Sequence, residues 1–182
     1  MLAKSWMRYD KFAMTLRNNT HPMRVLIDCN ILVSAAISGG VCLRAIAEAM
    51  ENHAIVMSED ILAEYRRVVE YPKFSSHIKS RMHILIEEIA LHSEFMVIPD
   101  NLPPTEEIED EDDLIYVIAA HVGEADAIIT GNTSHFTKPV YGRAMVVSAR
   151  EFINMCQAAS KNRPVSASKS RPPDPDLELH FR

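Results

Sequence analysis

The feature that most constrains this chain is a short apolar run, Val25-Leu26-Ile27, which ends directly in the carboxylate of Asp28. Apolar runs of this length, bounded by polar residues, are typical of strands buried on both faces, as in parallel sheets. Ligands of such sheets bind beyond the carboxyl ends of the strands. The run therefore predicts a parallel sheet with Asp28 at its functional edge.

The rest of the chain alternates short apolar segments with segments of helical periodicity, in the order β-α-β-α-α-β-α-β-β-α. The expected strands cover residues 25–27, 54–57, 95–98, 127–130 and 144–147. The expected helices cover about residues 41–50, 59–70, 76–92, 113–122 and 149–158. This alternation predicts an α/β fold: a three-layer α/β/α sandwich with a mostly parallel central sheet of about five strands.

The composition indicates one domain at residues 23–158, preceded by an N-terminal extension at 1–22. From residue 159 to residue 182 apolar residues nearly vanish, which is typical of a disordered tail. No apolar run is long enough to span a bilayer, and the first residues lack a signal-peptide core. The three cysteines are unclustered, which argues against a disulfide framework or a zinc site. These features predict a cytoplasmic enzyme or binding protein with no membrane partner.

The charge is distributed unevenly. The chain has a net charge of -6, but residues 24–158 carry 21 acidic residues and only 10 Lys or Arg, a net charge of -11. Such a core binds phosphates poorly by itself, so a nucleic-acid substrate would require metal ions or basic segments. Candidates for phosphate contacts are Arg66, Arg67, Lys73 and Lys79, although solvent-exposed charge is the commoner role for each. A basic partner protein is the other interpretation.

Three carboxylates are distinguished by their positions. Asp28 ends the first strand, and Glu64 interrupts an apolar helical stripe, where an acid is costly unless paired, hydrated or bound to a cation. Asp113 closes a run of seven acids within residues 106–113 and begins a helix apolar enough to be buried. Converging carboxylates bind Mg²⁺ or Mn²⁺, which can generate a hydroxide nucleophile for phosphodiester hydrolysis. Asn30, Thr130 and Asn132 could orient the acids or a bound water.

Each acid also has an ordinary structural role. Asp28 could cap the following helix, Glu64 could reach solvent at the edge of its stripe, and Asp113 could be a first-turn acid. Only the three together favour a metal site.

In this order and spacing, several motifs resemble the PIN-domain family, especially bacterial PIN proteins classed as toxins of toxin–antitoxin systems. They are Val25-Leu-Ile-Asp-Cys-Asn30, Glu64, the Asp112-Asp113 pair, Ala125-Asp-Ala-Ile-Ile-Thr-Gly-Asn132, the extension to His135-Phe136, and Val147-Ser148-x-Arg150-Glu-Phe152. The resemblance covers about residues 23–155.

The resemblance implies a metal-dependent endoribonuclease that uses Mg²⁺ or Mn²⁺ and acts on RNA. Asp28, Glu64 and Asp113 match the metal-binding acids of the family, and Asn30 and Thr130 match its polar support. Asn132 stands where many PIN domains carry a further acid; an amide adds no charge, and Asp112 could compensate. The resemblance also implies a cognate antitoxin as partner, and a homodimer is common among PIN relatives.

Two alternatives remain open. The first is a catalytically weak or inactive PIN-like module that binds RNA or protein, which Asn132 and the acidic core favour. The second is a phosphoryl-transfer domain with an aspartyl nucleophile. Its haloacid-dehalogenase form requires a second acid where this chain has Asn30, and its receiver form requires paired acids and a late lysine that are not evident.

Overall fold

The computed structural model describes residues 22–100, 111–133, 136 and 138–161, with only the backbone at 111–113 and 161. The chain divides into two compact units, one of residues 21–154 and one of residues 1–20 and 155–182. In the smaller unit the described residues are 155–161, the last turns of a helix, where Ser160 Oγ donates to the carbonyl of Cys156 at 3.0 Å. The expected extension and tail lie mostly outside the described residues, but this helix continues to Lys161, beyond the predicted end at residue 158.

The larger unit contains a six-stranded sheet in the order β3-β2-β1-β4-β6-β5. Its strands are β1 (Arg24–Ile27), β2 (Ala54–Ser58), β3 (Ser93–Met96), β4 (Ala127–Ile129), β5 (Val140–Tyr141) and β6 (Ala144–Val147). All neighbours are parallel except β5, which pairs antiparallel with β6. The mostly parallel sheet is thus confirmed, and the two-residue β5 is an addition that the sequence pattern did not indicate.

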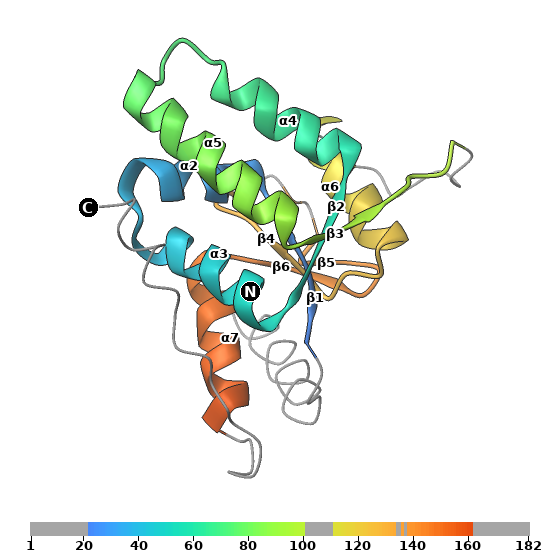
Figure 1. Ribbon diagram of the computed structural model, residues 1–182. Coiled ribbons are helices and arrows are strands. Elements are labelled where there is room, and N and C mark those ends of the chain that lie inside the picture. The colour runs from blue at the N-terminus through green and yellow to red at the C-terminus, as the bar shows by residue number, and fades with distance from the viewer. Residues whose placement is uncertain (1–21, 101–110, 134–135, 137, 162–182) are drawn as a thin grey trace. The chain divides into compact units, whose positions relative to one another are not determined.

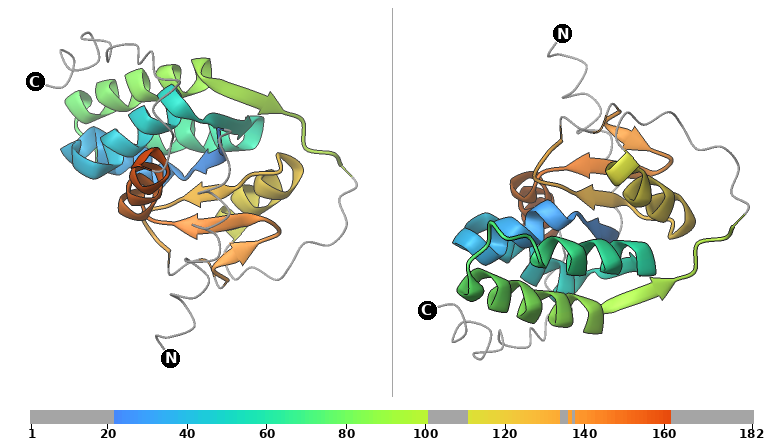
Figure 2. Two further views of the ribbon diagram at one scale, coloured as in Figure 1. Left: turned by 90° about the horizontal axis from the view of Figure 1, so that it is seen from below. Right: turned by 90° about the horizontal axis from the view of Figure 1, so that it is seen from above.

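In the part of the chain that the structure describes, six helices connect and follow the strands. They are α2 (Cys29–Ser38), α3 (Gly40–Asn52), α4 (Glu59–Val69), α5 (Ser76–Leu91), α6 (Glu111–Val122) and α7 (Ala149–Lys161). The steps from β1 to β2 and from β2 to β3 run in one direction across the sheet, whereas the step from β3 to β4 returns. Right-handed crossovers therefore put α2 to α5 on one face and α6 on the other. Figure 1 shows α3, α4 and α5 in front of the sheet, and Figure 2 shows α2 to α5 grouped together with α6 outside that group. This is the predicted three-layer α/β/α arrangement.

Helix α2 was not predicted, because only a helix at residues 41–50 was expected between the first two strands. Its residues are apolar nearly all round, with Ile31, Leu32 and Ala35 buried, so they lack a helical period of polarity. Its two ends carry recognisable signals, however. Asp28 caps the start by accepting the Asn30 N–H at 3.0 Å, and Gly39 follows the end with φ of 63°.

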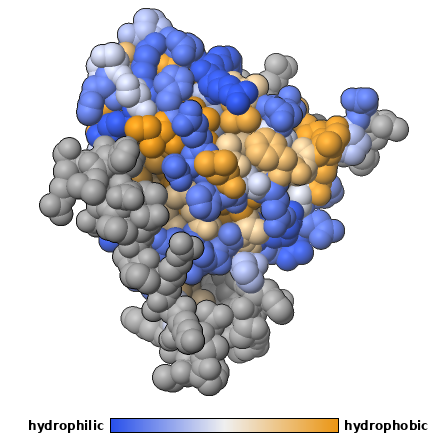
Figure 3. Space-filling model, in the orientation of Figure 1, coloured by the Kyte–Doolittle hydropathy of each residue, from blue (hydrophilic) through white to orange (hydrophobic). Residues whose placement is uncertain are grey.

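Strand β3 lies two residues earlier than the predicted 95–98 and is not a buried strand. It is an edge strand that pairs with β2 on one side, from Ser93 opposite Ile55 to Met96 opposite Ser58. Phe95 is 48% exposed, and Val97, just past the strand, is 88% exposed. Apolar atoms accordingly gather on the surface at the end of β3 (Figure 3). Apolar composition alone could not separate an open edge from a buried strand.

Serine residues cap the starts of three helices, α4, α5 and α7. Ser58 Oγ accepts the Ile61 N–H at 3.3 Å and so begins α4 directly at the end of β2. Ser75 begins α5, and Ser148 begins α7, where its hydroxyl and N–H both donate to Glu151 at 2.8 Å. Because α4 starts at the carboxyl end of β2, its early residues lie at the same edge of the sheet as Asp28.

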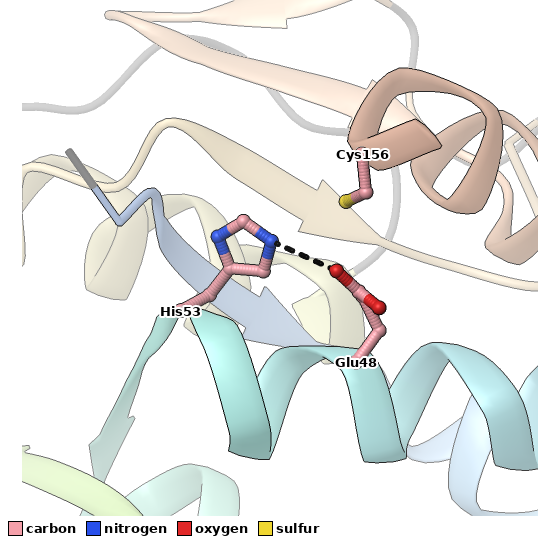
Figure 4. A group of neighbouring side chains, drawn as sticks. All are labelled: Glu48, His53 and Cys156. Carbon is pink, nitrogen blue, oxygen red and sulfur yellow. Dashed lines mark ion pairs between the residues drawn. The ribbon is translucent and has the colours of Figure 1, made fainter. Parts of the chain in front are cut away.

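His53, which follows α3, fixes the start of β1. Its Nδ1 accepts the Met23 N–H at 3.1 Å, and its ring packs edge-on against Phe152 at 5.3 Å. Burial lowers the pKa of His53 to about 4, against a smaller opposing effect of the Asp126 carboxylate. Nε2 faces Glu48 at 3.8 Å (Figure 4, which also labels Cys156 of the smaller unit). Since the imidazole is neutral above pH 4, this contact is not an ion pair at neutral pH.

We expect the free energy of unfolding to fall as the pH falls from about 6.5 to about 4. In that window the unfolded chain binds a proton at His53 and the folded chain does not, which is worth at most about 3 kcal/mol. Urea unfolding at several pH values measures the effect. His53→Gln cannot titrate, so its stability should change less over the same window; equal slopes for the two proteins would contradict the role of His53.

Candidate active site

Asp28 lies between β1 and α2, at the carboxyl edge of the sheet, and is only 2% exposed. Its N–H donates to the carbonyl of Ile129 in β4 at 2.9 Å. Its carboxylate accepts three described hydrogen bonds: from the Asn30 N–H at 3.0 Å, from Asn30 Nδ2 at 3.2 Å and from Thr130 Oγ1 at 2.5 Å. These donors are all uncharged, so they fix the orientation of the carboxylate without neutralising it.

Thr130 follows β4 directly and is fully buried. Its N–H donates to the carbonyl of Val147 at 2.9 Å, which holds it beside β6. Its hydroxyl accepts the backbone N–H of Asn132 at 2.9 Å and donates to Asp28. A hydroxyl that accepts and donates at once is polarised, and both bonds strengthen. The turn at residues 130–132 therefore supports Asp28 from the neighbouring strand.

Glu64 reaches the same region from α4. It is half-buried, and its Oε2 accepts the hydroxyl of Tyr116 in α6 at 2.5 Å. The same hydroxyl accepts the N–H of Cys29 at 3.0 Å, and Tyr116 is only 1% exposed. Tyr116 thus links Glu64 to the residue immediately after Asp28, and the two predicted acids lie at one site.

The side chains of Asp112 and Asp113 lie outside the described residues, as does His135. The backbone of both aspartates is in the first turn of α6, which begins at Glu111. Position 113 is three residues before Tyr116, so the two positions share one side of the helix and are about 4.5 Å apart along its axis. The structure therefore places the backbone of position 113 one helical turn before Tyr116, the residue whose hydroxyl binds Glu64.

The neutral groups around the acids remain neutral. Burial, together with the carboxylates of Glu64 and Asp28, raises the pKa of the Cys29 thiol, which stays protonated. Burial also raises the pKa of Tyr65 and of Tyr116 well above their usual value. Tyr65 donates its hydroxyl hydrogen to the carbonyl of Ile27, the residue before Asp28. Two tyrosine hydroxyls thus fix the backbone on either side of Asp28.

This arrangement presents carboxylate oxygens, held by neutral donors, at the edge of a parallel sheet. Carboxylate oxygens are the ligands that hard divalent cations prefer. The sequence pattern indicated the acids but not the roles of Tyr116 and Cys29. Tyr116 did carry a signal, because a hydroxyl in an otherwise aliphatic buried helix requires a partner.

Comparison with known proteins gives one positive result. A family model described as a PIN domain matches residues 24–134, which is more than half of the chain. No curated protein matches, and no solved structure matches. Among the described residues, no helix is both long enough and apolar enough to cross a membrane.

Tyr116→Phe should lower the free energy of unfolding by about 1–3 kcal/mol, because it leaves the buried Cys29 N–H without its acceptor and Glu64 without this donor. Urea unfolding measures the loss. Tyr71→Phe, the same substitution at an exposed site, is the control and should change stability little. Equal stability of the Tyr116 variant and the wild type would show that the hydroxyl does not hold the site together.

Proposed function

Because the chain belongs to the PIN-domain family, whose members are generally nucleases, we propose that it is a metal-dependent endoribonuclease. The observation that carries the proposal is the carboxylate of Asp28, which is buried at the carboxyl edge of the sheet with only uncharged described donors. A buried carboxylate is costly unless positive charge compensates it. The N-terminus of α2 supplies part of that charge, and a divalent cation would supply the rest.

The residues present fit Mg²⁺ or Mn²⁺. Asp28 and Glu64 would hold the ion through carboxylate oxygens, and Asp113 would be the third ligand, because its position lies one turn before Tyr116. When bound, such an ion lowers the pKa of a water molecule and neutralises the charge that develops on a phosphodiester.

The remaining residues orient the acids. Asn30 and Thr130 hold the Asp28 carboxylate, and Tyr116 holds Glu64. The two acidic side chains would therefore lose little conformational entropy when an ion binds. Asn132 supports the site through its backbone N–H to Thr130. Its amide side chain carries no charge, so Asp112 would supply a further carboxylate where a second ion binds.

We further propose that the chain is the toxin of a toxin–antitoxin pair. The support is the motif set from Asp28 to Phe152, which resembles that subgroup of PIN proteins. The net charge of -11 over residues 24–158 also suits a basic antitoxin segment. RNA would be the substrate, and the antitoxin would inhibit its cleavage.

Asp28→Asn should abolish RNA cleavage and leave the fold intact, because asparagine keeps an oxygen for the helix cap but removes the charge. Cleavage of labelled RNA in Mg²⁺ or Mn²⁺ measures activity, and circular dichroism checks the fold. Asp113→Asn should behave in the same way. Glu87→Gln, which removes an exposed acid of α5, is the control and should cleave normally. Undiminished cleavage by both aspartate variants would refute the assignment.

The amide at Asn132 favours a second candidate, a PIN-like module that binds RNA or protein without useful catalysis. Metal titration separates the two. For the nuclease, Mg²⁺ or Mn²⁺ should raise the Tm of the wild type but not that of Asp28→Asn or Glu64→Gln, because an ion that binds only the folded state stabilises it. Sodium chloride at matched ionic strength is the control. A wild-type Tm that does not respond to either ion would favour the binding module.

A further inference from the structure

The connection between α4 and α5, together with the adjoining turns of both helices, is a basic segment of an acidic domain. Residues 65–83 contain five of the ten Lys and Arg residues of 24–158 and one acid, Glu70. The other residues of 24–158 have a net charge of -15. A polyanion is repelled by most of this domain and attracted to this segment.

One of these basic residues, Arg67, lies on the same side of α4 as Glu64 of the candidate site. Glu64, Arg67 and Tyr71 are spaced i, i+3 and i+7, which places them along one side of α4 and the turn that continues it. Tyr71 stays in that path because its N–H donates to the carbonyl of Val68 at 3.2 Å. Arg67 is about 4.5 Å and Tyr71 about 10 Å beyond Glu64 along the helix axis. Arg66 is also exposed, but it faces the other side of α4.

Beyond Arg67, the aromatic ring of Tyr71 lies next to the ammonium group of Lys73. Tyr71 is 37% exposed, and Lys73 Nζ lies 5.4 Å from the centre of its ring and 5.1 Å from that of Phe74. Lys79 Nζ lies 3.6 Å from a carboxylate oxygen of Glu70 and donates to its carbonyl at 3.1 Å. That contact offsets the one acid of the segment and fixes the turn. Hydrophilic residues dominate the surface over α4 and this turn (Figure 3).

We propose that Arg67, Tyr71 and Lys73 form a binding surface for single-stranded RNA that leads to Glu64. An unpaired base stacks on the ring of Tyr71, and adjacent phosphates contact Arg67 and Lys73. Stacking requires an exposed base face, which a duplex hides, so the surface selects unpaired RNA. This inference rests on the proposed ribonuclease function and assigns the residues that receive its substrate.

The test is fluorescence anisotropy of the full chain in EDTA, with labelled oligouridine and with a labelled RNA duplex. Tyr71→Ala should weaken binding of the single strand about tenfold and leave duplex binding unchanged, whereas Tyr71→Phe should bind like the wild type. Phe95→Ala, which removes an exposed ring of β3, is the matched control and should have no effect.

Alanine substitutions test the roles of the basic residues. Arg67→Ala should weaken binding more than Arg66→Ala, because the two exposed residues lie on different sides of one helix. Lys73→Ala should lower the slope of log affinity against log salt by about 1. Single-strand binding by Tyr71→Ala that equals the wild type, or an equal loss for duplex RNA, would overturn the assignment.

Binding and cleavage measured together distinguish a failure of the proposed surface from a failure of the proposed ribonuclease function. If the wild type cleaves RNA with Mg²⁺ while the Tyr71 and Arg67 variants bind normally, the surface is wrong and the nuclease stands. If the wild type neither binds nor cleaves RNA, the proposed function fails, and the surface fails with it.

Discussion

The hydrogen bond from the Thr130 hydroxyl to the Asp28 carboxylate is the contact on which the functional edge depends. It joins the end of β4 to the junction of β1 and α2, two points 102 residues apart in sequence. The same carboxylate caps α2 through the Asn30 N–H, so one side chain begins a helix, connects two strands and presents a charge. A buried carboxylate with this many structural contacts is held in place before any ligand arrives.

The sequence was sufficient for a mostly parallel sheet and for the position of Asp28 at the end of its first strand, because short buried strands and a carboxylate after Ile27 leave a local pattern. It was not sufficient for α2, since a helix that is apolar nearly all round shows no period of polarity, or for β3, since an edge strand can be as apolar as a central one. The role of Tyr116 was not predicted for another reason. Its meaning lies in contacts with Glu64 and Cys29, which are far from it in sequence.

Two electrostatic regions meet on α4. Its early residues belong to an acidic edge that suits a cation, and its last turn begins the basic segment that suits a polyanion. A helix that carries both requires no conformational change to bring phosphate and metal together. Under the proposed function, the local positive charge of this segment would let RNA bind although residues 24–158 have a net charge of -11.

The buried thiol of Cys29 has a consequence for the chemistry of the cell. Peroxides attack the thiolate form of cysteine, and the reactivity of a cysteine follows both its ionisation and its exposure. Cys29 is 6% exposed, and burial and its two neighbouring carboxylates raise its pKa, so both conditions for oxidation are absent. The chain therefore keeps a sulfur atom beside its candidate site without making that site sensitive to oxidative stress.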